Sequence, residues 1–231
     1  MQSALHSAST LAAALARAVY EPNNGSAVAT VGELTAGPAL GKMLEVMMAE
    51  KEGRRLLLLQ PRITDATLDS ALQSPAGTFG ASYAQFMVVN RFKPGGRPPV
   101  QHIPDPTLAY VITRYREIHD FVHVITGCGR SVDEEIAVKL LEWHHTGLPL
   151  GLLSVVGGLP HLQQRERSRL WSTTLAWAAD NAPSGAHVDA TPLSASSKRA
   201  VRNILTVPWE DMLAIPHDEV LNWTGLRTFP R

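Results

Sequence analysis

Two successive helical patterns between residues 105 and 147 constrain the fold of this chain more than any other feature. Asp105 and Pro106 form a helix start, with Asp as the N-cap and Pro at the first helical position. Glycines at positions 127 and 129 interrupt the pattern, and Ser131 opens a second helix with a capping box. The stretch therefore predicts two antiparallel helices joined by a short turn.

Metal-binding side chains are concentrated in this predicted hairpin. His119 and His123 are four residues apart, so they lie on the same face of the first helix. Glu135 lies in the first turn of the second helix, where the facing helix would meet it. Imidazole and carboxylate groups are the ligands that zinc and ferrous iron prefer. Asp120 points about 100° away from His119, so it either reaches sideways to the metal or orients another ligand.

Length and composition are those of a single domain with a full hydrophobic core. The chain has 231 residues, of which 45% are hydrophobic, and its 21 basic and 21 acidic residues balance. This balance argues against a protein that binds nucleic acid by neutralising phosphates. A single cysteine excludes an intrachain disulfide, and the longest uncharged run, residues 146–160, is too short to span a membrane.

The first nineteen residues have two interpretations. They contain no acidic side chain, one arginine and several Ser and Ala residues, with apolar residues at roughly helical spacing. This composition is typical of a mitochondrial transit segment, although basic residues are few. It is equally typical of the first helix of the domain. We expect residues 20–231 to form one helical domain.

Helical patterns predominate in the rest of the chain. Apolar residues at three- and four-residue spacing predict helices within residues 31–50, 64–72, 78–90 and 165–177. Residues 198–213 predict a final helical or mixed segment. Strand signals are few, and only residues 27–31 and 54–60 are ambiguous between helix and strand. The predicted fold class is all-α, a single helical domain that contains a metal-binding helix hairpin.

The residues of the hairpin carry a resemblance to a known family. The run from Arg114 to His123, together with Glu135, resembles the signature His-Asp-x-x-His, eleven residues, Glu of the coenzyme Q (ubiquinone) biosynthesis protein 4 family. Flanking segments agree, among them residues 32–35, 61–63, 77–80, 146–149 and the Trp-Glu pair at 209–210. The resemblance extends over roughly residues 20–226.

The resemblance implies a site, a location and an assembly. It implies that His119, Asp120, His123 and Glu135 are the metal ligands, with Zn²⁺ or Fe²⁺ as the ion. It also implies an all-helical homo-oligomer that is a peripheral membrane protein at the matrix side of the mitochondrial inner membrane. The expected partners are a polyprenylated aromatic substrate, the membrane surface and other ubiquinone-biosynthesis proteins in a complex, without nucleic acid.

The implied activity is that of a metal-dependent lyase, a 4-hydroxy-3-methoxy-5-polyprenylbenzoate decarboxylase in ubiquinone biosynthesis. The ring carboxylate is replaced by a hydroxyl at the same carbon, C1, with loss of carbon dioxide. A para-phenolate pushes electrons toward that carbon, and a metal acts as a Lewis acid. The alternative is a non-catalytic, metal-stabilised lipid-binding scaffold that organises the other pathway enzymes. A zinc peptidase, which needs Glu in place of Asp120, and an HD-type phosphohydrolase fit the residues less well.

Residues near the motif have interpretations of their own. We expect the adjacent His144 and His145 to lie in solvent or at the rim of the site, because they point about 100° apart. Cys128 is expected to be a structural or incidental thiol. The charged and aromatic side chains at 114–116 either pair with neighbouring helices or meet the substrate's carboxylate. The apolar run at 148–159 would suit a polyprenyl tail or form ordinary core.

Overall fold

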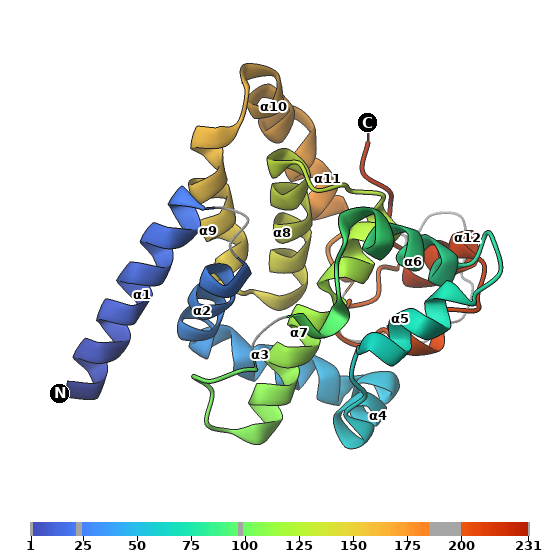
Figure 1. Cartoon of the computed structure of the whole chain (residues 1–231), viewed down its shortest axis with the longest axis horizontal. Helices are drawn as coiled ribbons and strands as arrows, with labels where there is room; N and C mark the ends of the chain where they lie inside the picture. The colour runs from blue at the N-terminus through green and yellow to red at the C-terminus, as the bar shows by residue number, and fades with distance from the viewer. Residues whose placement is uncertain (1, 22–24, 97–98, 185–199, 231) are drawn as a thin grey trace.

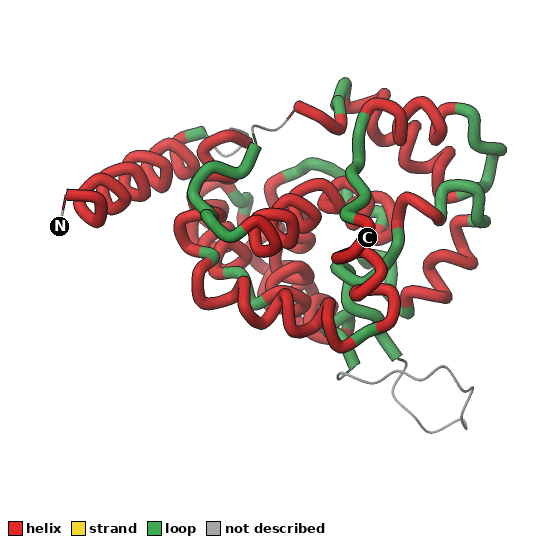
Figure 2. Tube along the Cα trace, turned by 90° about the horizontal axis from the view of Figure 1, so that it is seen from below, coloured by secondary structure: helices red, strands yellow, loops and turns green. Residues whose placement is uncertain are grey.

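The computed structural model describes residues 2–21, 25–96, 99–184 and 200–230, and this part of the chain contains helices and turns but no β-strand (Figures 1 and 2). The all-α prediction is therefore confirmed. The α-helices are α1 (Gln2–Tyr20), α2 (Gly25–Thr35), α3 (Gly37–Ala49), α4 (Lys51–Leu59), α5 (Asp65–Leu72), α6 (Phe79–Asn90), α7 (Pro106–Thr126), α8 (Val132–Thr146), α9 (Pro149–Gly158), α10 (Gln164–Arg169), α11 (Leu175–Asp180) and α12 (His217–Thr224). The 3₁₀ turns η1 (Pro94–Gly96), η2 (Leu159–His161) and η4 (Trp209–Asp211) and the π-helical turn η3 (Leu170–Thr174) complete them.

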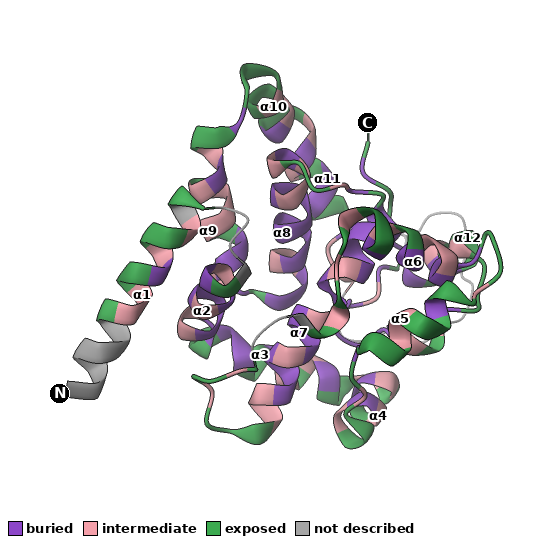
Figure 3. Ribbon diagram, in the orientation of Figure 1, coloured by how far each residue is buried: buried purple, intermediate pink, exposed green. Residues whose placement is uncertain are grey.

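Helices α7 and α8 form the predicted hairpin at the centre of the molecule, where most of their residues are buried (Figure 3). Asp105 caps α7 by accepting the backbone N–H of Leu108 at 2.8 Å. Gly127 ends α7 with φ of 69°, a left-handed conformation that glycine adopts without strain. Ser131 and Glu134 form the capping box that starts α8. The local signals in the sequence thus set both helix boundaries at the turn.

Helix α9 packs unusually closely against α8. A Cβ atom on Gly151 would lie 2.5 Å from both the carbonyl oxygen of Lys139 and the Cβ of Trp143. Any larger residue at this position would push the two helices apart. The same helix also contacts α2 and α1, so it joins the central hairpin to the N-terminal helices.

The N-terminal helices form a layer of their own. Helices α1 and α2 pack against each other and against α9 through a small hydrophobic cluster around Ala14, Val31 and Leu150, separate from the main core (Figure 1). One buried carboxylate ties α2 to the centre. Glu33 pairs with Arg116 of α7 at 2.8 Å and accepts the backbone N–H groups of residues 101 and 102.

Both segments that were ambiguous between helix and strand are helical. Residues 27–31 belong to α2, and residues 54–59 belong to α4. The pattern at 31–50 covers the end of α2 and all of α3, which are separated at Ala36. The helices predicted within 64–72, 78–90 and 165–177 are all present, the last as α10, η3 and α11 in sequence.

The helical or mixed segment predicted at 198–213 contains a single 3₁₀ turn, η4, and no α-helix among its described residues; 198 and 199 lie outside them. Residues 201–208 form a loop with a turn at 204–206, and the last α-helix begins only after Pro216. Tertiary contacts hold this segment in place. The buried guanidinium of Arg114 donates to the carbonyl oxygens of Leu205 and Val207 and pairs with Glu210. Such contacts leave no local sequence pattern.

Of the helices in the described ranges, none combines the length and the apolar character that crossing a bilayer requires.

Candidate metal centre

A cavity of about 510 Å³ lies beside the hairpin, between α7 and α8 on one side and the layer of α1, α2 and α9 on the other. The turn that follows α6 contributes to its wall as well. Four residues named from the sequence line this cavity, namely His119, Asp120, His123 and Glu135. The predicted site is therefore located in a space that a ligand can enter.

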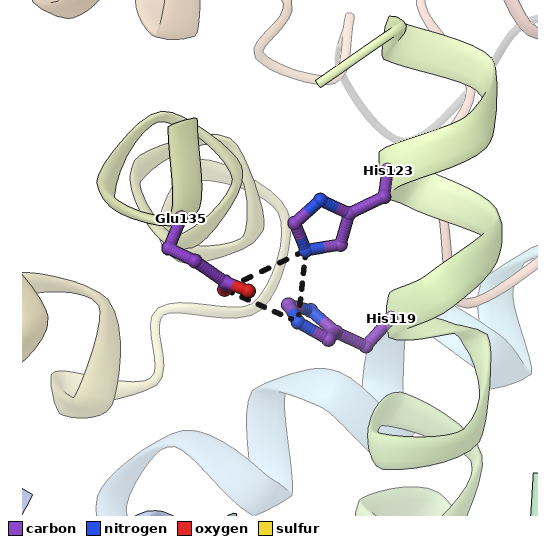
Figure 4. A group of neighbouring side chains, drawn as sticks. All are labelled: His119, His123 and Glu135. Carbon is purple, nitrogen blue, oxygen red and sulfur yellow. Dashed lines mark hydrogen bonds and ion pairs between the residues drawn. The ribbon is translucent and has the colours of Figure 1, made fainter. Parts of the chain in front are cut away.

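Three of these side chains converge on one point (Figure 4). The Nε2 atoms of His119 and His123 are 3.1 Å apart. One carboxylate oxygen of Glu135, Oε2, lies 3.6 Å from the first of these nitrogens and 3.5 Å from the second. The two histidines come from successive turns of α7 and the glutamate from the first turn of α8, as the spacing of eleven residues predicts.

These distances fit a metal ion. With metal–nitrogen bonds of about 2.0–2.1 Å, two ligands of a four-coordinate zinc lie about 3.3 Å apart. The three observed separations fall on either side of that value. Two imidazoles and one carboxylate are also the donor set of catalytic zinc and ferrous sites. The side chain of Glu135 is 36% exposed, and all three residues line the cavity, so the converging group borders this space.

His119 is oriented from behind by a second carboxylate. Its Nδ1 lies 2.6 Å from Oε1 of Glu142, which is fully buried on α8. An ionised carboxylate can only accept hydrogen bonds, so Nδ1 carries the proton and Nε2 presents a lone pair. Lys139 and Tyr115 both donate to the other oxygen of Glu142, at 2.7 Å each. This is the arrangement by which proteins orient a metal-binding imidazole.

His123 is held in the same tautomer by the backbone. Its Nδ1 donates to the carbonyl oxygen of Cys128 in the turn after α7, at 3.4 Å, and its ring stacks on Phe86. Both histidines therefore point a lone pair at the same place. Two lone pairs and a carboxylate oxygen repel one another unless a cation lies between them. A proton or a metal ion satisfies this requirement, and the donor set is that of a metal centre.

The charges of the site agree with this arrangement. Burial by itself would raise the pKa of Glu135, but when protons take the place of the cation on His119 and His123, the hydrogen bonds and charges of these two rings outweigh burial and lower the pKa well below its usual range. Burial would likewise raise the pKa of Glu142, and the charge of Lys139 together with His119 lowers it instead. Both carboxylates are therefore ionised at neutral pH.

Asp120 is not part of the converging group. It is half-buried at the cavity wall, one residue round the helix from His119, and the structure does not bring its carboxylate to the point where the other three meet. Coordination by Asp120 stays a prediction.

Sequence reasoning missed Glu142 and Lys139. A signal was available, because Glu135, Lys139 and Glu142 are spaced at i, i+4 and i+7 and so share one face of α8. Lys139 and Glu142 lie on the same face of α8 as the proposed ligand Glu135, so they are buried wherever that face packs against α7. Their burial required the two charges to be paired with each other.

The prediction that His145 lies in solvent or at a rim was wrong. His145 is buried, its Nε2 donates to the carbonyl oxygen of Asn181 at 2.8 Å, and its Nδ1 accepts the backbone N–H of Ile204. Burial lowers the pKa of His145 to about 4. His144 is half-buried and, like His145, lies outside the converging group. The segment around Ile204, which covers His145, is distant in sequence. The prediction considered only that His144 and His145 are neighbours, so it did not anticipate this burial.

The remaining residues of the motif have structural partners. Arg114 and Arg116 form ion pairs with Glu210 and Glu33, which confirms the expected pairing with neighbouring segments. Cys128 is buried outside the converging group, and burial raises the pKa of its thiol to about 12. A thiol with such a pKa stays protonated and is a poor metal ligand.

The apolar run at 148–159 forms α9, and its two faces differ. Leu150, Leu153 and two glycines of this helix line the cavity. Leu152 and Val156 on the other face are exposed. The run is thus partly cavity wall and partly surface.

Comparison with known proteins identifies the family. The sequence model described as Coenzyme Q (ubiquinone) biosynthesis protein Coq4 matches residues 2–230. The chain belongs to the Coq4 family. A relative from Trypanosoma cruzi, named ubiquinone biosynthesis protein COQ4 homolog 1, mitochondrial, is 50% identical over 214 residues, which cover 93% of this chain and 81% of that protein. A Leishmania major COQ4 homolog, also named mitochondrial, is 49% identical over 191 residues, 81% of this chain and 95% of the homolog.

A solved structure agrees with the fold. The crystal structure of a protein assigned to ubiquinone biosynthesis from Nostoc punctiforme superimposes with a TM-score of 0.68 and covers 95% of this chain and 96% of its own. The sequences are only 16% identical, so this likeness concerns the Coq4 fold alone.

Proposed function

We propose that this Coq4 protein binds a divalent metal through His119, His123 and Glu135 and catalyses the oxidative decarboxylation of a 4-hydroxy-3-methoxy-5-polyprenylbenzoate at C1. The observation that carries the proposal is the convergence of two imidazole lone pairs and a carboxylate, with both Nδ1 atoms already bonded elsewhere. Zinc and ferrous iron both suit these donors. A metal held here would supply Lewis-acid chemistry to a bound oxygen atom of the substrate.

The reaction balances with dioxygen as the oxidant. The bond between C1 and the carboxyl carbon breaks, carbon dioxide leaves, and C1 forms a bond to the oxygen atom of a water molecule. The aromatic acid loses two electrons overall, and dioxygen accepts them. One acid, one dioxygen and one water give one phenol, one carbon dioxide and one hydrogen peroxide. The protein positions the reactants, and the electrons pass from the aromatic acid to dioxygen.

The protein's own residues orient the substrate and hold a proton on Nδ1 of His119. The side chains of α1, α2 and α9 give the cavity a largely apolar wall, which suits a polyprenyl tail. Lys139 and Arg116 line the cavity near the converging group, each paired with a buried carboxylate. The pair of Lys139 with Glu142 keeps the proton on Nδ1 of His119, so that its Nε2 stays available.

The setting of the reaction is also a proposal. The relatives from Trypanosoma cruzi and Leishmania major are named mitochondrial. We extend this location to the chain and, with the family resemblance, propose peripheral attachment at the matrix side of the inner membrane. We further propose a homo-oligomer that assembles with other ubiquinone-biosynthesis proteins. Affinity purification from mitochondria followed by crosslinking tests both assemblies.

The decisive experiment follows the carboxyl carbon. Purified protein is loaded with zinc or ferrous iron and incubated with a prenylated 4-hydroxy-3-methoxybenzoate that is isotopically labelled at the carboxyl group. Labelled carbon dioxide should appear under air and not under argon, and H₂¹⁸O rather than ¹⁸O₂ should label the new hydroxyl, because both oxygen atoms of dioxygen leave as hydrogen peroxide. The Glu135→Gln variant should release none. Release that is equal in this variant and in the wild type would contradict the proposal.

The alternative is a metal-stabilised, lipid-binding scaffold without catalytic activity. One observation favours it, because the donors come from both helices of the hairpin and an ion would crosslink them. X-ray absorption spectroscopy of the metal-loaded protein separates the two functions. A scaffold site should have all of its coordination positions filled by protein, whereas a catalytic site should keep one for water or substrate.

A further inference from the structure

The cavity has a cluster of cations at its mouth that neither the fold nor the metal centre explains. Arg91 and Lys93 flank Phe92 in the turn after α6, and Arg130 comes from the turn between α7 and α8. All three cations are exposed and line the same cavity as the metal-binding residues. We call these three residues the basic rim.

Within the described part of the chain, the charges of the basic rim have no acidic partner. Each of the other cavity-lining cations, Arg116 and Lys139, forms a close ion pair with a buried carboxylate. Among the residues that the structure describes, no carboxylate lies within ion-pair distance of Arg91, Lys93 or Arg130. The inner cations are thus neutralised, whereas the outer ones are left to bind an incoming anion.

One cation of the rim, Arg130, is held in place by an aromatic ring. The guanidinium of Arg130 stacks on Phe92, 4.4 Å from the ring centroid. Phe92 packs edge-on against Phe86, and Phe86 stacks on His123 of the converging group. A cation that is already stacked loses less side-chain freedom on binding than a free one. These ring contacts connect Arg130, through Phe92 and Phe86, to His123 of the converging group.

We propose that the basic rim is a second anion-binding position, which captures the ring carboxylate of the substrate at the cavity mouth and distinguishes the acid from its decarboxylated product. This inference rests on the proposed function, because it takes that carboxylate as the anion. The acid carries a charge that the rim attracts, and the product does not. Capture by exposed cations also raises the rate of association and makes it sensitive to salt.

The experiment compares two ligands that differ only in the carboxylate. Metal-loaded protein is titrated calorimetrically, without oxygen, with 4-hydroxy-3-methoxy-5-prenylbenzoate and with 2-methoxy-6-prenylphenol. The double variant Arg91→Gln/Arg130→Gln removes two rim charges. The matched control Lys42→Gln/Lys51→Gln removes two exposed charges from α3 and α4, outside the cavity lining. Metal content and melting temperature are measured for each protein.

The rim variant should bind the acid about 10-fold more weakly than the wild type and bind the phenol equally well. The control should match the wild type for both ligands. Added salt should weaken binding of the acid to the wild type more than to the rim variant. Equal affinity of the wild type and the rim variant for the acid would overturn the inference and leave the proposed function standing.

Two further outcomes also count against the rim as a carboxylate site. If the wild type binds neither ligand, the inference and the proposed function both fail. Anionic phospholipid vesicles form the last arm of the test. If the rim variant loses affinity for the vesicles while keeping that for the acid, the rim is a membrane contact and the inference is overturned.

Discussion

Two buried histidines of the central hairpin have opposite surroundings. His145 has a partner at each ring nitrogen, since one donates to a carbonyl oxygen and the other accepts a backbone N–H. His119 has a firm partner only at Nδ1, and its Nε2 faces the Nε2 of His123. His145 therefore has a structural role, whereas Nε2 of His119 is positioned to bind a cation. The number of satisfied nitrogens therefore separates a structural imidazole from a metal-binding one better than burial does.

The largest expected effect is on metal binding at the converging group. Glu135→Gln removes the only negative donor, and metal affinity should fall by more than about 100-fold, beyond what loss of an outer contact costs. Metal content after dialysis, measured by mass spectrometry, checks this. His144→Gln is the control and should keep its metal. Retention of metal by Glu135→Gln would remove this residue from the ligand set.

The second-largest effect is expected on the stability of the protein when His145 is replaced. His145→Gln should lower the free energy of unfolding by about 2–3 kcal/mol at pH 7, because a buried N–H and a buried carbonyl lose their partner. Metal content of the folded protein should not change. Urea unfolding of the metal-free protein measures the first quantity. A loss of metal in this variant would mean that the two histidine sites are coupled.

His145 also gives the wild type a pH dependence. Burial lowers its pKa from about 6.5 in the unfolded chain to about 4, so the unfolded state binds a proton that the folded state does not. Stability from this group is full above pH 6.5, falls as the pH drops toward 4, and levels off below that, a loss of at most about 3 kcal/mol. The His145→Gln variant should lack this part of the slope. Identical slopes in the two proteins would show that the imidazole is not buried in neutral form.

A smaller effect is expected for the carboxylate behind His119. In Glu142→Gln an amide oxygen still accepts from Nδ1, but the charge that orients the imidazole is lost. Metal affinity should fall about 10-fold, less than for Glu135→Gln. Competition with a chelator measures the difference. Glu45→Gln, an exposed acid on α3, is the control. Equal losses at positions 135 and 142 would show that both act on the metal in the same way.

The smallest effect is expected for Asp120, which lies outside the converging group. Asp120→Asn should change metal affinity less than about threefold, as expected for a carboxylate at the cavity wall that does not coordinate the ion. The same chelator competition applies. A loss as large as that of Glu135→Gln would place Asp120 among the ligands, as the family resemblance implies, and would require its side chain to turn toward His119.

The sequence predicted the hairpin well because its signals are local. Asp105, Gly127 and Ser131 mark helix ends through contacts within a few residues. The pairing of His119, His123 and Glu135 follows from helical spacing and a short turn. All that was needed lay within one continuous stretch of chain.

Features that depend on distant segments were not predictable in this way. The loop at 201–208 is held by Arg114, ninety-one residues from one of its partners, and it in turn covers His145. The role of Glu142 depends on burial against α7, which no local pattern records. Errors therefore occurred where a residue's surroundings come from another part of the chain.

The contact at Gly151 has a consequence for the shape of the cavity. Because a hydrogen atom alone separates α9 from the backbone of α8 at this point, the distance between these helices is at its minimum. A methyl group at this position would push α9 away from α8 and enlarge the cavity. The substitution would change no residue that contacts a bound ligand. The width of the cavity, and with it the size of ligand that fits, thus depends on a residue that does not line the cavity.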